Sequence, residues 1–190
     1  SKVQPSRSDE KNFKILFIGS VTDRKKPHLI VEAINKIKNK DIKLYVVGPT
    51  PNENYLSQLK ELVHNYDLED QVLFTGSVDR KSVMDHYADT NLMILPSVSE
   101  GLARVIFESQ ATACPVLVTD APGMGDIVID GQTGYIFESD NLESLTNKIQ
   151  EIINNYNDAV HVGNNAKDFI LSNYSADNFK FSFKKLFDTV

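Results

Sequence analysis

The chain has 190 residues, about one domain in length, and its 41% hydrophobic and 24% charged residues are ordinary for a globular protein. Its formal net charge is −6 and its basic residues are scattered, which argues against nucleic acid as a partner. No apolar run approaches the roughly 20 residues that cross a bilayer, and one cysteine with four isolated histidines gives neither an internal disulfide nor a metal-ligand cluster.

The start of the chain, SKVQPSRSDEKN, is polar and lacks the apolar segment of a secretory signal. We interpret residues 1–12 as a tag remnant or linker and residues 13–190 as one domain. Such a start is compatible with an excised fragment of a larger protein. The single Cys114 favours a reducing, cytoplasmic setting.

Short apolar runs alternate along the chain with amphipathic stretches, which predicts strands alternating with helices. The strands are expected at residues 14–19, 43–48, 71–76, 91–97, 115–120 and 134–137. The helices are expected near residues 29–37, 54–66, 82–88, 102–113, 125–129, 142–155, 159–173 and 176–187.

The predicted strands are apolar throughout rather than alternating, which is typical of a parallel sheet buried on both faces. Their alternation with helices predicts an α/β domain with a doubly wound, parallel, Rossmann-like sheet. Such sheets bind ligands just beyond the carboxyl ends of their strands. The site is therefore expected in the loops that begin at Gly19, Gly48, Gly76, Pro96 and Asp120.

One segment, residues 95–120, joins a strand and a Pro-Ser turn to Glu100, Gly101 and a helix that carries Glu108. Gly101 lets the backbone approach a ligand closely, and the free N–H groups at the helix start favour an anion such as a diphosphate. Glu100 can reach sugar hydroxyls, and Glu108 can accept hydrogen bonds from a ribose. A simpler alternative stays open, in which Glu108 pairs with Arg104 and Glu100 only caps the helix.

The order of these pieces resembles the family 4 glycosyltransferases of GT-B fold. Residues 95–120 contain Pro-Ser-x-x-Glu-Gly, a Glu-x7-Glu spacing and Pro-Val-φ-φ-Thr-Asp, preceded by KILFIGSVTDRKKPHLIVEAI and followed by DAPGMGDIVIDGQTGYIF. The likeness extends from Ile15 to about Ile153. It implies the C-terminal, donor-binding half of a GT-B fold, with the N-terminal, acceptor-binding domain absent from this chain.

The resemblance also implies roles for the residues around the two glutamates. Glu100 corresponds to the first motif glutamate, which contacts the donor sugar and is the candidate catalytic residue. Glu108 corresponds to the second, which holds the ribose. The backbone of Gly101, Leu102 and Ala103 would meet the sugar and the distal phosphate.

Further donor contacts follow from the same resemblance. Lys25 corresponds to the lysine that neutralises the diphosphate, just beyond the glycine turn at Gly19. Ser77 and Val78 lie where the family's backbone brackets the nucleobase.

The sequence departs from the family pattern directly after the first glycine, where Ser20 replaces an arginine. Arg24, Lys26 or Arg104 could supply the missing cation. Without the motif, the basic run at residues 24–26 would be an ordinary solvated loop.

A second departure surrounds Cys114, where Ala-Thr-Ala-Cys replaces a more usual Met-Ala-x-Gly turn. We interpret Cys114 as a small buried residue, since no base is placed to activate it.

The expected activity is transfer of a sugar from a nucleotide-diphosphate sugar to an acceptor hydroxyl with retention, in bacterial surface polysaccharide synthesis. No cofactor is expected, and no metal, because Asp-x-Asp is absent and Lys25 faces the phosphates. A peripheral association of the full-length enzyme with the inner face of the membrane stays open.

Two other classes of function also stay open: a non-catalytic nucleotide-binding module, and half of a sugar-nucleotide epimerase or phosphorylase. A nicotinamide dehydrogenase is not expected, because the first strand is followed by GSVTDR rather than Gly-x-Gly-x-x-Gly. The nucleobase, sugar, acceptor and oligomeric state do not follow from the sequence.

Overall fold

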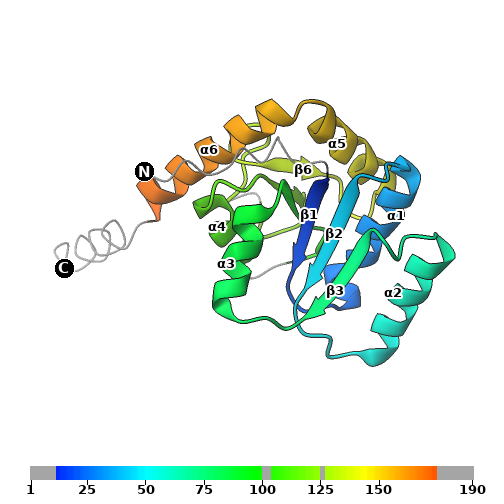
Figure 1. Cartoon of the computed structure of the whole chain (residues 1–190). Helices are drawn as coiled ribbons and strands as arrows, with labels where there is room; N and C mark the ends of the chain where they lie inside the picture. Colours follow the sequence, from blue (N-terminus) through cyan, green and yellow to red (C-terminus); the bar gives the residue numbers. More distant parts are fainter. Residues whose placement is uncertain (1–11, 100–103, 125–126, 175–190) are drawn as a thin grey trace.

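The computed structural model describes residues 12–99, 104–124 and 127–174, and it confirms the predicted doubly wound α/β fold (Figure 1). All neighbouring strands of its sheet pair in parallel, in the order β3-β2-β1-β4-β5-β6. The strands are β1 (Phe13–Ile18), β2 (Ile42–Val47), β3 (Val72–Gly76), β4 (Leu92–Leu95), β5 (Val116–Thr119) and β6 (Tyr135–Phe137).

Helices cover both faces of this sheet. They are α1 (Pro27–Ile37), α2 (Glu53–Asn65), α3 (Arg80–Asp89), α4 (Arg104–Ala111), α5 (Leu142–Asn154) and α6 (Tyr156–Asn173), with a short 3-10 turn, η1 (Asp23–Lys25), after β1. Figure 1 shows α1 and α2 on one side of the sheet and α3 and α4 on the other. Right-handed crossovers require this arrangement, because the strand order reverses between β3 and β4.

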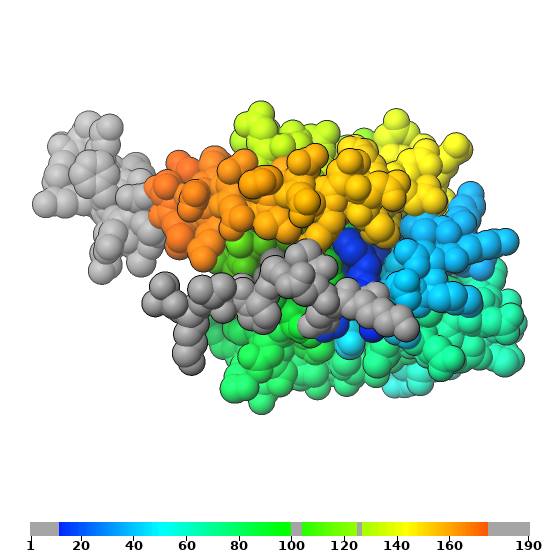
Figure 2. All heavy atoms as spheres, turned by 45° about the horizontal axis from the view of Figure 1, so that its top comes forward, coloured from blue at the N-terminus to red at the C-terminus, as the bar shows by residue number. Residues whose placement is uncertain are grey.

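The last two helices complete the helical layers on the two faces of the sheet. Helix α5 packs against α1, and α6 packs against α4. Figure 2 shows α6, α5 and α1 following one another across one face of the molecule.

The core lies along the central strands, and it explains why their sequences are apolar on both faces. Ile15, Leu16 and Phe17 of β1 are fully buried, as are all residues of β4 and β5. Strand β3 lies at the edge of the sheet, and its Leu73 stays 41% exposed.

The predicted helix near residues 125–129 is wrong where the structure describes it, because residues 127–129 form a turn and irregular chain. The N–H groups of Ile127 and Val128 both donate to the carbonyl of Met124 (3.1 and 3.0 Å), and other backbone groups of the segment bind side chains. The buried Gln110 side chain donates to the carbonyls of Ile127 (3.3 Å) and Thr133 (2.8 Å), and the Ile129 N–H donates to the Thr133 hydroxyl (2.9 Å). A turn-rich connection therefore joins β5 to β6. The predicted helix at 176–187 lies outside the described residues.

Two glycines hold the carboxyl ends of β1 and β2 unusually close together. Gly19 and Gly48 both have positive φ, +145° and +138°. A Cβ added to Gly48 would lie 2.1 Å from the carbonyl oxygen of Gly19, a separation that side chains do not tolerate. Gly48 therefore allows the loop after β2 to pack directly on the loop after β1.

The variant Gly48→Ala should lose about 3 kcal/mol or more of unfolding free energy, because it combines an unfavourable φ with a backbone clash. The matched control is Gly131→Ala, where φ is also positive (+69°) but nothing lies within 4 Å of the added methyl. Gly131→Ala should lose only about 1 kcal/mol. Urea denaturation of both variants measures the difference, and equal losses would contradict a steric role for Gly48.

Candidate functional site

The loops after β1 and β4 meet at the point where the strand order reverses, which is where open α/β sheets bind ligands. Two hydrogen bonds join these loops. The Arg24 guanidinium donates through Nη1 to the carbonyl of Ser99 (2.5 Å), and the Val98 N–H donates to the carbonyl of Arg24 (3.3 Å). The end of β1 is thus fixed against the chain that leads into residue 100.

Lys25, the predicted diphosphate ligand, ends η1, and its side chain lies over the end of β1. A Cβ placed on Gly19 would be 3.7 Å from both Cε and Nζ of Lys25. The side chain is half-buried rather than extended into solvent. The structure therefore brings Lys25 to the carboxyl end of the central strand.

The other basic residues of this region have different surroundings. Lys26 has a left-handed backbone (φ 49°) and forms an ion pair with Asp140, which lies just before α5. Arg24 points to Ser99, and Arg104 is exposed at the first residue of α4. Lys26 is therefore turned toward Asp140, and Arg24 and Arg104 stay open as substitutes for the missing arginine.

Glu108, the predicted ribose ligand, is half-buried in the middle of α4, where it faces α3. Its Oε2 accepts a hydrogen bond from the hydroxyl of Tyr87 on α3 (3.2 Å). Tyr87 is fully buried, and burial raises the pKa of its phenol, an effect that the negative charge of Glu108 increases. No ion pair joins Glu108 to Arg104 in the described part of the chain, whereas the other part of that alternative, a helix cap by Glu100, lies outside the described residues.

The remaining described candidates lie along the same edge of the sheet. Ser20 is half-buried between two backbone bonds, in which the N–H of Gly19 donates to Val47 (2.9 Å) and that of Val21 donates to Pro49 (2.8 Å). Ser77 and Val78 follow β3, two strands away from β1. Ser77 is exposed, and Val78 packs against the core.

The four candidates Glu100, Gly101, Leu102 and Ala103 lie outside the described residues. The chain that leads to them contains Ser97, which is fully buried, and whose carbonyl accepts from the Thr119 hydroxyl (2.7 Å). Within the described part of the protein, the Ser97 hydroxyl has no hydrogen-bond partner. A bound polar group at this site could satisfy it.

Sequence reasoning missed Tyr87, Ser97 and Asp140. Ser97 belongs to the Pro-Ser turn that the motif contains, so that motif was its signal. No local pattern pointed to Tyr87 or Asp140, because their partners lie far from them in the chain. Glu108 is 21 residues from Tyr87, and Lys26 is 114 residues from Asp140.

Neither a metal-ligand cluster nor a membrane-spanning helix occurs within residues 12–99, 104–124 and 127–174. No three side chains of His, Cys, Asp or Glu gather there as a metal site requires. No helix there is long and apolar enough to span a bilayer. Cys114 is buried, as expected of a small packing residue.

The chain is thus a Rossmann-like α/β domain with a lysine over the end of β1, at the topological switch point where such sheets bind ligands. The chain belongs to the group 1 glycosyltransferases, because the model of that family, described as "Glycosyl transferases group 1", matches residues 1–169.

Individual relatives support this assignment. The capsular polysaccharide biosynthesis glycosyltransferase CapM of Staphylococcus aureus is 26% identical over 175 residues, which cover 87% of this chain and 43% of CapM. The crystal structure of Anabaena Alr3699/HepE in complex with UDP and glucose is similar with a TM-score of 0.87 at 19% identity, over 95% of this chain and 49% of that one. The chain thus spans less than half the length of either protein.

A solved structure of similar size also matches. The C-terminal domain of the glycosyl transferase group 1 family protein LpcC from Francisella tularensis has a TM-score of 0.82 at 20% identity, over 93% of this chain and 95% of that domain. This likeness shows that the two chains share a fold over nearly their whole lengths.

The variant Tyr87→Phe should lower the unfolding free energy by about 1 kcal/mol, because it keeps the buried ring but removes the hydrogen bond to Glu108. Chemical denaturation at neutral pH measures the change. Tyr66→Phe is the matched control, because Tyr66 is only partly buried against the core. A loss no larger than that of the control would show that the bond contributes nothing.

Proposed function

We propose that this chain is the donor-binding domain of a retaining glycosyltransferase of the family 4 type, with Glu100 and Glu108 as its Glu-x7-Glu pair. The observation that carries the proposal is the position of Lys25 over Gly19 at the switch point of the sheet. A cation held there can meet the diphosphate of a nucleotide sugar. Arg24 ties the same loop to Ser99, one residue before Glu100.

In the proposed reaction, the bond between the anomeric carbon and the diphosphate oxygen breaks, and the diphosphate leaves with the electron pair. The acceptor oxygen then forms its bond on the same face of the sugar and passes its proton to the oxygen of the departing diphosphate. Lys25 and the N–H groups at the start of α4 would stabilise the charge on the leaving diphosphate. Glu100 would orient the sugar, and Glu108 would hold the ribose.

The remaining donor contacts follow the same arrangement. The backbone of Gly101, Leu102 and Ala103 would meet the sugar and the distal phosphate. Ser77 and Val78 would bracket the nucleobase. We propose that no metal is required, because the lysine and the helix start supply the positive charge.

The wider role is proposed from relatives. CapM acts in capsular polysaccharide biosynthesis by its name, and HepE was solved with UDP and glucose. We propose that this chain binds a UDP-sugar, and that the whole enzyme builds a bacterial surface polysaccharide on the cytoplasmic side of the membrane. An N-terminal domain outside this chain would bind the acceptor.

The variant Lys25→Ala should weaken UDP binding about tenfold or more, because the diphosphate loses a charge-assisted contact. Lys26→Ala is the matched control: it is the next residue and also a lysine, but it pairs with Asp140 and should leave the affinity within about twofold. Isothermal titration calorimetry with UDP measures both. Equal losses would mean that only the general charge of the loop matters.

Glu108→Gln should weaken the binding of UDP about tenfold. It should change the binding of inorganic pyrophosphate little, because only the nucleoside carries ribose hydroxyls. A non-catalytic nucleotide-binding module that lacks the motif contacts would instead keep its nucleotide affinity in this variant. Ligand-observed NMR with uridine, guanosine and adenosine diphosphate sugars would select the base. No binding of any of them would overturn the donor-site proposal.

The 190-residue chain should bind its donor weakly and show little or no sugar transfer, because the acceptor site belongs to the proposed missing domain. An assay of UDP release, with and without acceptor, tests this directly. Measurable turnover by the chain alone would refute it. Conversion of the donor sugar without any acceptor, once the missing domain is supplied, would favour an epimerase instead.

A further inference from the structure

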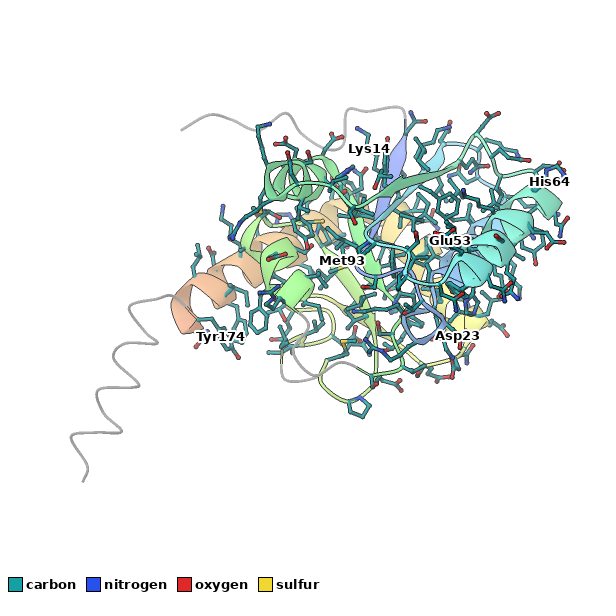
Figure 3. The ribbon with its side chains drawn as sticks, turned by 90° about the horizontal axis from the view of Figure 1, so that it is seen from below. Lys14, Asp23, Glu53, His64, Met93 and Tyr174 are labelled. Atoms are coloured by element: carbon teal, nitrogen blue, oxygen red, sulfur yellow. The ribbon has the colours of Figure 1, made fainter. Side chains whose placement is uncertain are left out.

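A groove of mixed polar and apolar lining runs between α1 and α2, outside the proposed donor site. It encloses about 400 Å³ and is open to solvent. Asp23 of η1 and Asn54 of α2 line it, and Figure 3 shows Asp23 nearer to Glu53, at the start of α2, than to His64, at the far end of that helix. The groove therefore begins near the carboxyl edge of the sheet and continues down between the two helices.

A fixed aromatic pair forms part of the wall. The hydroxyl of Tyr55 lies 2.8 Å from Nδ1 of His28, and the two rings meet edge to face with centroids 6.1 Å apart. Burial raises the pKa of Tyr55 to about 12 and lowers the pKa of His28. Both groups are therefore neutral near pH 7, and Nδ1 of the imidazole can accept a hydrogen bond from the phenol.

The charges of the groove disfavour an anion. Its lining includes the carboxylates of Asp23 and Glu32 and contains no lysine or arginine. Lys26 is close in sequence, but it pairs with Asp140. A phosphate or diphosphate would therefore meet two carboxylates, whose charge the nearby Lys26 offsets only in part, and this makes the groove chemically unlike the donor site around Lys25.

The hydrogen-bonding groups match a neutral polyhydroxyl ligand. The amides of Asn54 and Gln58 offer both donors and acceptors, and Glu32 adds an acceptor. Sugar hydroxyls also donate and accept, whereas an organic cation would use the acceptors alone. Leu59 and Leu62 supply the apolar part of the lining, against which the C–H faces of a sugar ring can pack.

We propose that the groove between α1 and α2 is a second carbohydrate-binding site, which holds a neutral saccharide other than the donor. Asp23 lies two residues before Lys25 in the same 3-10 turn, so one short segment contributes to both sites. If the proposed transferase activity holds, this saccharide is part of the acceptor or the product glycan. The binding itself does not depend on that activity.

Chemical-shift mapping by NMR on the 190-residue chain tests the proposal. The neutral probes are maltotriose, galactose and N,N′,N″-triacetylchitotriose, each added up to its solubility limit. At least one should shift the side-chain amide signals of Asn54 and Gln58 and the ring signals of Tyr55. Spermidine serves as the cationic probe and should compete weakly or not at all. No shift with any neutral probe, or stronger binding of spermidine, would overturn the proposal.

Variants then locate the site. Glu32→Gln and Gln58→Ala should each weaken the binding of the saccharide about tenfold, since each removes a hydrogen bond. In Glu32→Gln the lost hydrogen bond is one to a charged group. Glu61→Gln is the control, because Glu61 is an exposed residue of α2 that does not line the groove. Thermal unfolding confirms that the variants fold. Unchanged affinity in both groove variants would refute the site.

UDP added to the same sample separates this proposal from the donor proposal. UDP should shift the backbone signals of Gly19 and Lys25 and leave Gln58 unchanged. Saccharide binding without UDP binding would refute only the donor site. UDP binding without saccharide binding would refute only the groove.

Discussion

The contact between Gly48 and the carbonyl of Gly19 is the constraint on which the rest of the site depends. It brings the loops after β1 and β2 together with no side chain between them. The β1 loop must then leave the sheet on one path, through the backbone bond from Val21 to Pro49, before η1 begins. Lys25 ends that turn, so its place over β1 results from a glycine that is 23 positions further along the chain.

Hydrogen bonds from polar side chains fix helix α4, which carries Glu108, against its neighbours. The Tyr87 hydroxyl links α3 to Glu108 of α4, and the Gln110 side chain links α4 to the turn between β5 and β6. Because Gln110 is fully buried, loss of these bonds would leave polar groups without water. Helix α4 is thus held on two sides.

The sequence predicted the sheet well because the strands are buried on both faces, and burial leaves an apolar run that can be recognised locally. It failed near residues 127–129, where the apolar residues pack beneath a turn: Ile127 and Val128 are buried although they are not helical. Apolar spacing alone cannot tell these two cases apart. One contact of the turn comes from Gln110, which lies 17 residues before Ile127 and which no local pattern reveals.

Only those residues of the candidate site that belong to the family motifs could be predicted from the sequence. The motif singled out Lys25 but could not separate the roles of its neighbours. Lys26 forms its ion pair with a residue 114 positions away, a partner that no local pattern reveals.

The groove between α1 and α2 was not foreseen for a related reason. Its lining comes from η1, α1, α2 and the N-cap of α2, and no local pattern in the sequence marks these polar residues as neighbours.

The short turn η1 therefore contributes opposite charges to two neighbouring surfaces of the domain. Lys25 lies over the end of β1, whereas Asp23 lines the groove, and Lys26 pairs with Asp140. Two unit charges in contact near a protein surface interact by several kcal/mol, so under the two proposals the two sides of η1 would select ligands of different kinds. An anionic diphosphate would be favoured on one side, and a neutral saccharide would be tolerated on the other. A single loop conformation would thus keep a charged donor and an uncharged glycan apart while placing both at the same edge of the sheet.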